Sequence, residues 1–176
     1  MDVNDAVLTR LTVREYKPDA VPDDVVDRLL EAGRLSPSSQ NLQPWHFIVI
    51  RDAATIKRLG EMATQGPFLG DAPLAIAVVT DDTPRAPLDA GRAIQQMELV
   101  AWEAGMGTCF IGIRDADQNA AIKGVLGVPA HLVLLTILPF GYRKSVNMGK
   151  FGRRNRRALS EVAHSERFGN TYTHSG

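Results

Sequence analysis

Two groups of arginines, one near each end of the chain, are the side chains best suited to hold an anion. Arg10 and Arg14 lie four positions apart, with the hydroxyl group of Thr12 between them, so both guanidinium groups could meet one anion at a helix end. A second basic cluster, near the C-terminal end, contains Arg154 and Arg156. A phosphate monoester is doubly charged or nearly so and favours forked arginine partners. Solvated surface charge and a nucleic-acid patch remain alternative interpretations of these arginines.

A polar loop over residues 36–44 (SPSSQNLQP) is dense in neutral hydrogen-bonding groups. Ser38, Ser39 and Asn41 supply donors and acceptors, and prolines near both ends, the first of them Pro37, stiffen the backbone. A planar heterocycle with several carbonyls and ring nitrogens needs such neutral partners at fixed positions. The same composition is also typical of an ordinary turn between a helix and a strand.

Glycines mark a third segment, residues 105–115 (GMGTCFIGIRD). Glycine permits the backbone to approach a ligand closely. Gly112, at the end of an expected strand, could direct backbone N–H groups at a flat ring. A plain connection between a helix and a strand explains the same residues, and this segment alone favours that simpler explanation.

The elements that must position these segments alternate between helices and strands. From helical spacing and apolar runs, the expected helices are 3–10, 22–35, 53–62, 87–104 and 115–126, and the expected strands are 45–50, 74–80, 108–112 and 132–138. The apolar runs 74–80 and 132–138 are typical of strands covered on both faces, which predicts helices on both sides of a mixed sheet. The helix over 87–104, about 27 Å long at 1.5 Å per residue, is apolar around much of its circumference and belongs in a core or a subunit interface.

Composition sets further limits on the class of protein. A chain of 176 residues, 44% hydrophobic and 23% charged, suits one globular domain over residues 1–176. Its formal net charge of zero gives no electrostatic case for binding nucleic acid or a membrane surface. The chain shows neither a signal peptide nor an apolar run of roughly 18 residues, so a cytoplasmic location is expected.

Two further features concern the single cysteine and the C-terminal region. Cys109 is the one cysteine, so no internal disulfide and no metal site is predicted. It has no partner histidine in its motif, and we expect it to be buried and inert. After Pro139 the chain has few apolar residues, which predicts that this part lies along another surface, such as that of a partner subunit.

Taken together, four segments resemble the nitroreductase family. They are RLTVREY, SPSSQNLQPWHF, GMGTCFIGIRD and RRNRRALSEV, in this order and with these separations. The resemblance covers about residues 8–170, and PSSQNLQPWHF is its most specific part. It implies an α+β fold with a mixed central β-sheet flanked by helices, FMN as cofactor, and a homodimer in which each FMN lies between two subunits. The C-terminal tail would extend over the partner subunit.

The resemblance also implies roles for individual residues. Arg10, Thr12 and Arg14 would hold the phosphate and the polar edge of the flavin. Pro37, Ser38 and Ser39 of the partner subunit would line the ring, and Asn41 would bond to its pyrimidine side. The backbone N–H groups of Gly112 and Ile113 would face the reactive ring nitrogen and the adjacent carbonyl, and Arg154 and Arg156 would complete the phosphate clamp.

The chemistry implied is hydride transfer by a ping-pong mechanism. NADH or NADPH would reduce the flavin, and a nitroaromatic, a quinone or a similar small acceptor would reoxidise it, with the protein supplying position and electrostatics. No catalytic side chain is assigned, and His46, His131 and His164 are expected to be structural or exposed. Thr12 stands where relatives often have serine, and the short segment between Met62 and Pro73 lacks the substrate-shaping helices of larger relatives.

Two alternatives to this enzyme remain. The first is a flavin-binding relative with another chemistry, such as dehalogenation or flavin fragmentation, or a flavin-binding module without redox turnover. The second is a nucleic-acid-binding protein that uses the basic C-terminal cluster; zero net charge and the scarcity of interleaved aromatic residues oppose it.

Overall fold

The computed structural model describes residues 1–144 and 156–172. The chain divides into two compact units, a main unit of residues 1–145 and a C-terminal unit of residues 146–176. The main unit contains five helices, α1 (Val3–Thr9), α2 (Asp23–Arg34), α3 (Ala53–Met62), α4 (Ala86–Glu103) and α5 (Ala116–Leu126); five strands, β1 (Trp45–Ile50), β2 (Leu74–Asp81), β3 (Met106–Thr108), β4 (Ile111–Gly112) and β5 (Leu132–Tyr142); and two 3-10 turns, η1 (Ser39–Asn41) and η2 (Pro67–Asp71). The described part of the C-terminal unit holds one 3-10 turn, η3 (Leu159–Glu161). The prediction of one domain over 1–176 stays a prediction.

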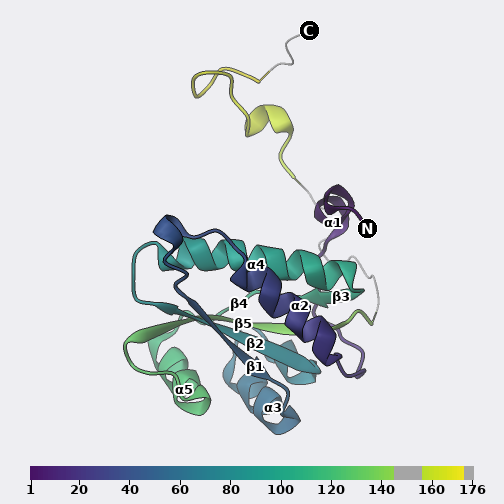
Figure 1. Cartoon of the computed structure of the whole chain (residues 1–176), viewed down its shortest axis with the longest axis vertical. Coiled ribbons are helices and arrows are strands. Elements are labelled where there is room, and N and C mark those ends of the chain that lie inside the picture. The colour runs from purple at the N-terminus through teal and green to yellow at the C-terminus, as the bar shows by residue number, and fades with distance from the viewer. Residues whose placement is uncertain (145–155, 173–176) are drawn as a thin grey trace. The chain divides into compact units, whose positions relative to one another are not determined.

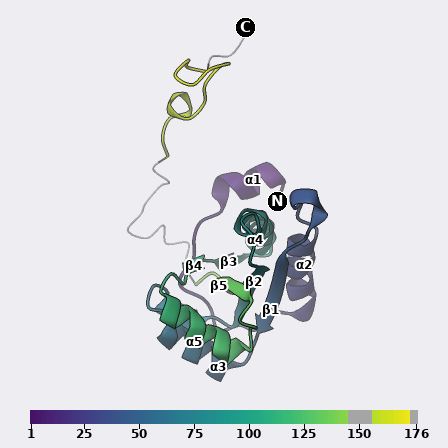
Figure 2. The same ribbon diagram turned by 90° about the vertical axis from the view of Figure 1, so that its left-hand side faces the viewer.

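A central sheet lies between two layers of helices, as Figures 1 and 2 show. Helices α2 and α4 cover one face, and α3 and α5 cover the other. The strand order is β1-β2-β5-β3, and β4 also pairs with β5. The predicted α+β fold, with a sheet flanked by helices, is therefore confirmed.

The prediction of a mixed sheet is wrong for the described residues, in which every pairing between named strands is antiparallel. A covered apolar run shows that both faces of a strand are buried, and it carries no information on the direction of the neighbouring strand. Here α3 and η2 connect β1 to an antiparallel neighbour, β2.

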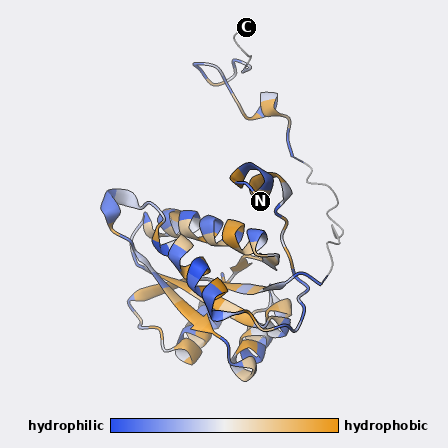
Figure 3. Ribbon diagram, turned by 45° about the vertical axis from the view of Figure 1, so that its right-hand side comes forward, coloured by the Kyte–Doolittle hydropathy of each residue, from blue (hydrophilic) through white to orange (hydrophobic). Residues whose placement is uncertain are grey.

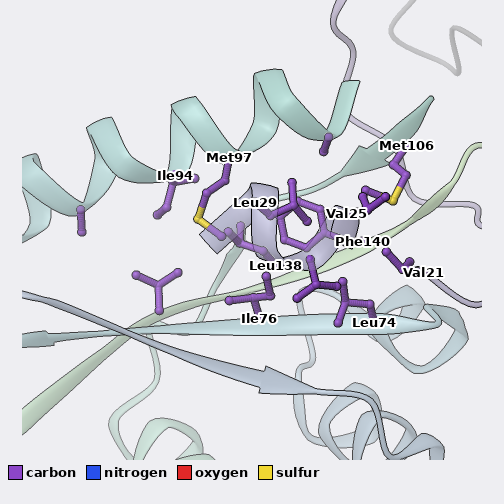
Figure 4. Packing of buried hydrophobic residues seen from close by; sticks show 14 residues of the cluster. Val21, Val25, Leu29, Leu74, Ile76, Ile94, Met97, Met106, Leu138 and Phe140 are labelled. Carbon is purple, nitrogen blue, oxygen red and sulfur yellow. The ribbon is translucent and has the colours of Figure 1, made fainter. Parts of the chain in front are cut away.

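Strand β2 separates two apolar cores. Leu74, Ile76 and Val78 pack toward α2 and α4, while Ala75 and Ala77 pack toward α3 and α5, as the period of two in a strand requires. Figure 4 shows the first core, in which side chains of α2 and α4 meet the sheet, and Figure 3 shows the hydrophobic strands enclosed between helices. These two cores make the sheet a rigid base for the loops at its edges.

Several element ends follow from local chemistry. Asp52 accepts a hydrogen bond from the backbone N–H of Thr55 at the start of α3, and Asp115 does the same for Gln118 in α5. The expected strand over 108–112 is divided into β3 and β4, which pair with different parts of β5. No helix in residues 1–144 or 156–172 has the length and hydrophobicity needed to cross a membrane.

Candidate functional site

The segment that carries Arg10, Thr12 and Arg14 docks on strand β3. The backbone N–H of Val13 donates to the carbonyl oxygen of Thr108 over 3.0 Å. Val13 is buried, whereas Thr12 and Arg14 are exposed, so the extended backbone sends the polar side chains away from the core. Gly107 makes this contact possible, because a Cβ there would overlap the side chain of Val13.

Contacts on both sides of the segment fix it further. The indole N–H of Trp102 in α4 donates to Thr9 Oγ1 over 2.9 Å at the end of α1. The guanidinium carbon of Arg143 lies 3.8 Å from the centroid of the Trp102 ring, a cation–π contact. At the other end, the Lys17 backbone N–H donates to the carbonyl oxygen of Tyr142 over 2.8 Å. The two arginines are therefore presented from a fixed backbone.

A buried carboxylate lies beside the first arginine. Arg10 Nη1 is 3.4 Å from Glu98 Oε2, and the Glu98 side chain is only 11% exposed. Burial raises the pKa of Glu98, and the neighbouring Arg10 charge opposes that rise. Arg14 has a different partner, since its guanidinium carbon lies 5.7 Å from the centroid of the Phe68 ring.

Cys109 is buried and free, as predicted. Burial raises the pKa of its thiol, and Arg14 lowers it by a smaller amount. A buried thiol with a raised pKa is protonated and weakly nucleophilic, so the structure supports no nucleophilic role for this side chain.

The glycine segment, residues 105–115, contains both β3 and β4. Ile111 and Ile113 are buried in the core under α3 and α5, while Gly112 between them is half-buried. The Ile111 backbone N–H donates to Thr136 Oγ1 over 3.2 Å. We call residues 10–14 together with residues 106–113 the arginine corner, because the Val13–Thr108 hydrogen bond joins the two predicted segments.

The polar loop over residues 36–44, which we call the Ser39 loop, has a strained backbone and is held by residues at the start of α4. Gln40, Asn41 and Gln43 have φ angles of 52°, 56° and 50°, which non-glycine residues adopt at an energetic cost. The Ser39 backbone N–H donates to Asp89 Oδ2 over 3.0 Å, and Arg85 Nη1 donates to Ser39 Oγ over 2.6 Å.

The loop also makes contacts of its own. The Gln43 backbone N–H donates to Ser38 Oγ over 2.9 Å, while Pro37 and Asn41 are exposed. Exposed groups on a fixed backbone are available to a ligand or to a second chain.

Within one chain the Ser39 loop and the arginine corner lie toward opposite ends of α4 (Figure 1). Asp89, which holds the loop, and Glu98, which holds Arg10, are nine positions apart, or roughly 13 Å along the helix axis. The structure therefore joins the segment of Arg10, Thr12 and Arg14 to β3, while Gly112 lies on β4, four positions further along β5. Pro37, Ser38, Ser39 and Asn41 lie in the loop that Asp89 holds, toward the other end of α4. That these residues form one binding site stays a prediction.

The basic C-terminal cluster is described only in part. Arg154 lies outside the described residues. Arg156 is exposed in the C-terminal unit, and its predicted place in a phosphate clamp stays a prediction. Of the histidines, His46 and His131 are exposed and His164 is half-buried.

Sequence reasoning missed the residues that support the site. Asp89 is only 2% exposed, but an aspartate in the first turn of a helix is ordinarily explained by the helix dipole. Glu98 carries a clearer signal, since it interrupts the apolar residues Met97 and Leu99 within α4. Phe68 and Trp102 gave no signal, because an aromatic residue in an apolar pattern is ordinarily part of the core.

Known proteins share both this fold and these segments. A model of the nitroreductase family matches residues 7–83 and 63–142. A protein of Methanothermobacter thermautotrophicus, provisionally named an NADH dehydrogenase/NAD(P)H nitroreductase, is 32% identical over 148 residues, which cover 81% of this chain and 78% of that protein. The solved structure of an FMN-dependent nitroreductase from Clostridium difficile R20291 superposes with a TM-score of 0.84 at 29% identity, covering 94% of this chain and all of that one.

A more distant relative has another name. An iodotyrosine deiodinase of Thermotoga neapolitana is 24% identical over 164 residues, covering 78% of this chain and 87% of that protein. The fold and the matched sequence define the class of α+β oxidoreductases to which these relatives belong. The chain belongs to the nitroreductase family and is an enzyme of that class.

Proposed function

We propose that this protein is an FMN-dependent oxidoreductase that passes hydride from NAD(P)H to a nitroaromatic, a quinone or a similar small acceptor. The observation that carries the proposal is the arginine corner, in which the segment with the two arginines is hydrogen-bonded to β3, and Gly112 lies on the following strand, β4. Both strands pair with β5. One end of that corner suits a phosphate group, and the other suits a flat ring.

The corner fits a phosphate monoester. Arg14 is exposed and Arg10 is half-buried. Within the described residues, neither guanidinium group forms a close bidentate ion pair with a carboxylate. A phosphate would therefore gain charge-assisted hydrogen bonds from both guanidinium groups and from the Thr12 hydroxyl. In the proposal, Arg154 and Arg156 add further positive charge to the same group.

The corner also fits a flat ring. A Cβ built on Gly112 would meet no heavy atom of the described residues closer than 3.8 Å, apart from its chain neighbours. Because glycine has no side chain, an isoalloxazine could lie close to the N–H groups of Gly112 and Ile113, between the side chains of Phe110 and Arg114 that border this position. Such donors stabilise negative charge that develops on the ring during reduction.

We infer that the Ser39 loop reaches this ring from a second copy of the chain. The loop lies toward the other end of α4 from the arginine corner of its own chain, so a second copy would supply the missing neutral groups. Exposed apolar side chains on α1 and α4, among them Val3, Leu8 and Leu88, offer a surface for such a dimer. In the C-terminal unit, exposed Leu159 and Phe168 suit a tail that lies over a partner subunit.

The protein's own part in this mechanism is positioning and charge. When bound, FMN supplies the two-electron chemistry that links NAD(P)H to the acceptor in a ping-pong sequence. Arg10, Thr12 and Arg14 hold the phosphate, so that the ring is fixed relative to Gly112. The Gly112 and Ile113 backbone N–H groups then act on charge at the ring without movement of a side chain. No general acid or base of the protein is required.

The test is an anaerobic absorption spectrum of the purified protein reconstituted with FMN. We expect a flavin spectrum that is bleached on addition of NADH or NADPH and restored by a nitroaromatic or a quinone. A second candidate, a flavin enzyme of different chemistry, is suggested by the similarity to a deiodinase; bound flavin that neither NADH nor NADPH bleaches would favour it. A protein that binds no FMN would overturn the proposal.

A further inference from the structure

The segment of residues 110–114 alternates between the core and the opposite face of the sheet edge. Ile111 and Ile113 point into the core and are 2% and 7% exposed. The alternate residues Phe110, Gly112 and Arg114 therefore share the opposite face. Phe110 is 49% exposed, and Arg114 is exposed as well.

Phe110 and Arg114 flank the glycine closely. A Cβ placed on Gly112 would lie 3.8 Å from Arg114 Nε and 4.0 Å from Phe110 Cε1. Both atoms are at van der Waals distance from that position, so an aromatic ring borders Gly112 on one side and a guanidinium group borders it on the other. A flavin ring that lay on Gly112 would be bordered by both side chains, which could then reach a substrate stacked on the ring.

The Arg114 guanidinium is not committed to another group in the part of the chain that the structure describes, where it has no hydrogen bond and no ion pair. Its nearest acidic neighbour in the sequence, Asp115, is occupied as the cap of α5, where it accepts a hydrogen bond from the Gln118 N–H. An arginine beside an aromatic ring, with its charge uncompensated, suits an anionic group on a planar ligand.

We propose that Phe110 and Arg114 form a substrate subsite that selects flat aromatic substrates bearing a carboxylate, sulfonate or phosphate group. The inference rests on the proposed function, because it requires the flavin ring to lie on Gly112. Phe110 stacks against the aromatic part of the substrate, and Arg114 pairs with its anionic group. The anion can belong to the acceptor or to the nicotinamide donor, and both sources use the same chemistry.

The experiment uses the FMN-loaded enzyme and compares pairs of substrates in which one member carries an anionic group that the other lacks. The acceptor pair is para-nitrobenzoate and para-nitrobenzamide, and the donor pair is NADPH and NADH. In Arg114→Gln we expect the preference for the anionic member of one pair, expressed as a ratio of kcat/KM values, to fall by about threefold to tenfold, the range for an exposed or half-exposed charge pair. Arg114→Lys, which keeps the charge, should retain most of the preference.

Arg58→Gln is the matched control, since Arg58 is an exposed arginine on α3 that should leave both ratios unchanged. A fall in the acceptor ratio identifies the acceptor as the source of the anion, and a fall in the donor ratio identifies the donor phosphate. If both ratios in Arg114→Gln equal those of the wild type, or if anionic and neutral substrates lose rate equally, this inference is overturned while a normal flavin spectrum leaves the proposed function intact. Absence of bound FMN overturns both.

Discussion

The arginine corner and the Ser39 loop both hold polar groups in fixed positions, but different contacts hold each of them. The corner is held by a backbone hydrogen bond to a strand and by a glycine that admits Val13. The loop contains three non-glycine residues with positive φ and depends on the buried carboxylate of Asp89 in another element. The corner is thus part of the sheet, whereas the loop is a strained segment that a helix keeps in shape. A ligand that contacts both the arginine corner and the Ser39 loop therefore depends on two regions that differ in local stability.

The largest loss of stability and of FMN affinity should come from adding a side chain at Gly107, where Val13 packs against the backbone. In Gly107→Ala the new methyl group would overlap Val13, and overpacking of this kind costs about 1–3 kcal/mol of folding stability. Because the segment with both arginines must move, we expect FMN affinity to fall as well. Chemical denaturation and FMN titration measure the two effects.

Gly91→Ala is the control for this variant, because a Cβ at Gly91 in α4 meets nothing within 4 Å. A Val13→Ala change added to Gly107→Ala should restore part of the loss. If Gly107→Ala and Gly91→Ala were equally stable and bound FMN equally well, the docking of the arginine segment on β3 would not matter to the site.

Arg10→Ala tests the proposed phosphate contact directly. Loss of a charge-assisted hydrogen bond should weaken FMN binding by about 1.5–3 kcal/mol, and the same is expected for Arg154→Ala. Isothermal titration with FMN and with riboflavin, which lacks the phosphate, gives the measurement. Riboflavin affinity should change little in these variants; an unchanged affinity for FMN would show that the clamp is assigned wrongly.

Asp89→Ala tests the support of the Ser39 loop. The Ser39 N–H loses its acceptor, which should cost about 1–3 kcal/mol of stability, and the loop should lose its fixed geometry. Hydrogen exchange across residues 36–44 should then become faster. Asp117→Ala, at an exposed aspartate in α5, serves for comparison, and equal exchange rates in the two variants would mean that Asp89 does not hold the loop.

The smallest effect concerns the pH dependence of stability at Glu98. Burial raises its pKa in the folded protein, so the folded state binds this proton more tightly than the unfolded state. The contribution of Glu98 is therefore most favourable below its unfolded pKa and is lost as the pH rises through the folded pKa. The free energy of unfolding of the wild type, relative to that of Glu98→Gln, should fall as the pH is raised from about 4 toward 7. A relative stability that rises over this range would contradict the assignment.

How much of this structure the sequence predicts depends on how far apart in the sequence the contacting residues lie. The bounds of β1 and α3 agree with the predicted 45–50 and 53–62, because local periodicity and capping determine them. Strand direction and the division of the strand over 108–112 depend on pairing with β5, which no local pattern reveals.

The same division holds for the site. Each segment of the arginine corner and the Ser39 loop also fits an ordinary turn, and the segments stand out only in combination, because their order and separations resemble those of the nitroreductase family. Their supports do not: Asp89 contacts Ser39 across 50 positions, and Trp102 contacts Thr9 across 93. Such long-range hydrogen bonds are made only when the packing of α4 brings the segments together.

The most direct test asks whether corner and loop of different copies complete one another. One variant carries Arg10→Ala and Arg14→Ala, and the other carries Ser39→Ala and Asn41→Ala; each alone should bind FMN poorly. Co-expression with two affinity tags isolates the mixed dimer, in which one site holds all four substitutions and the other holds none. We predict one FMN per mixed dimer, bound with wild-type affinity. Two weak sites, or none, would mean that each chain builds its flavin site without the other.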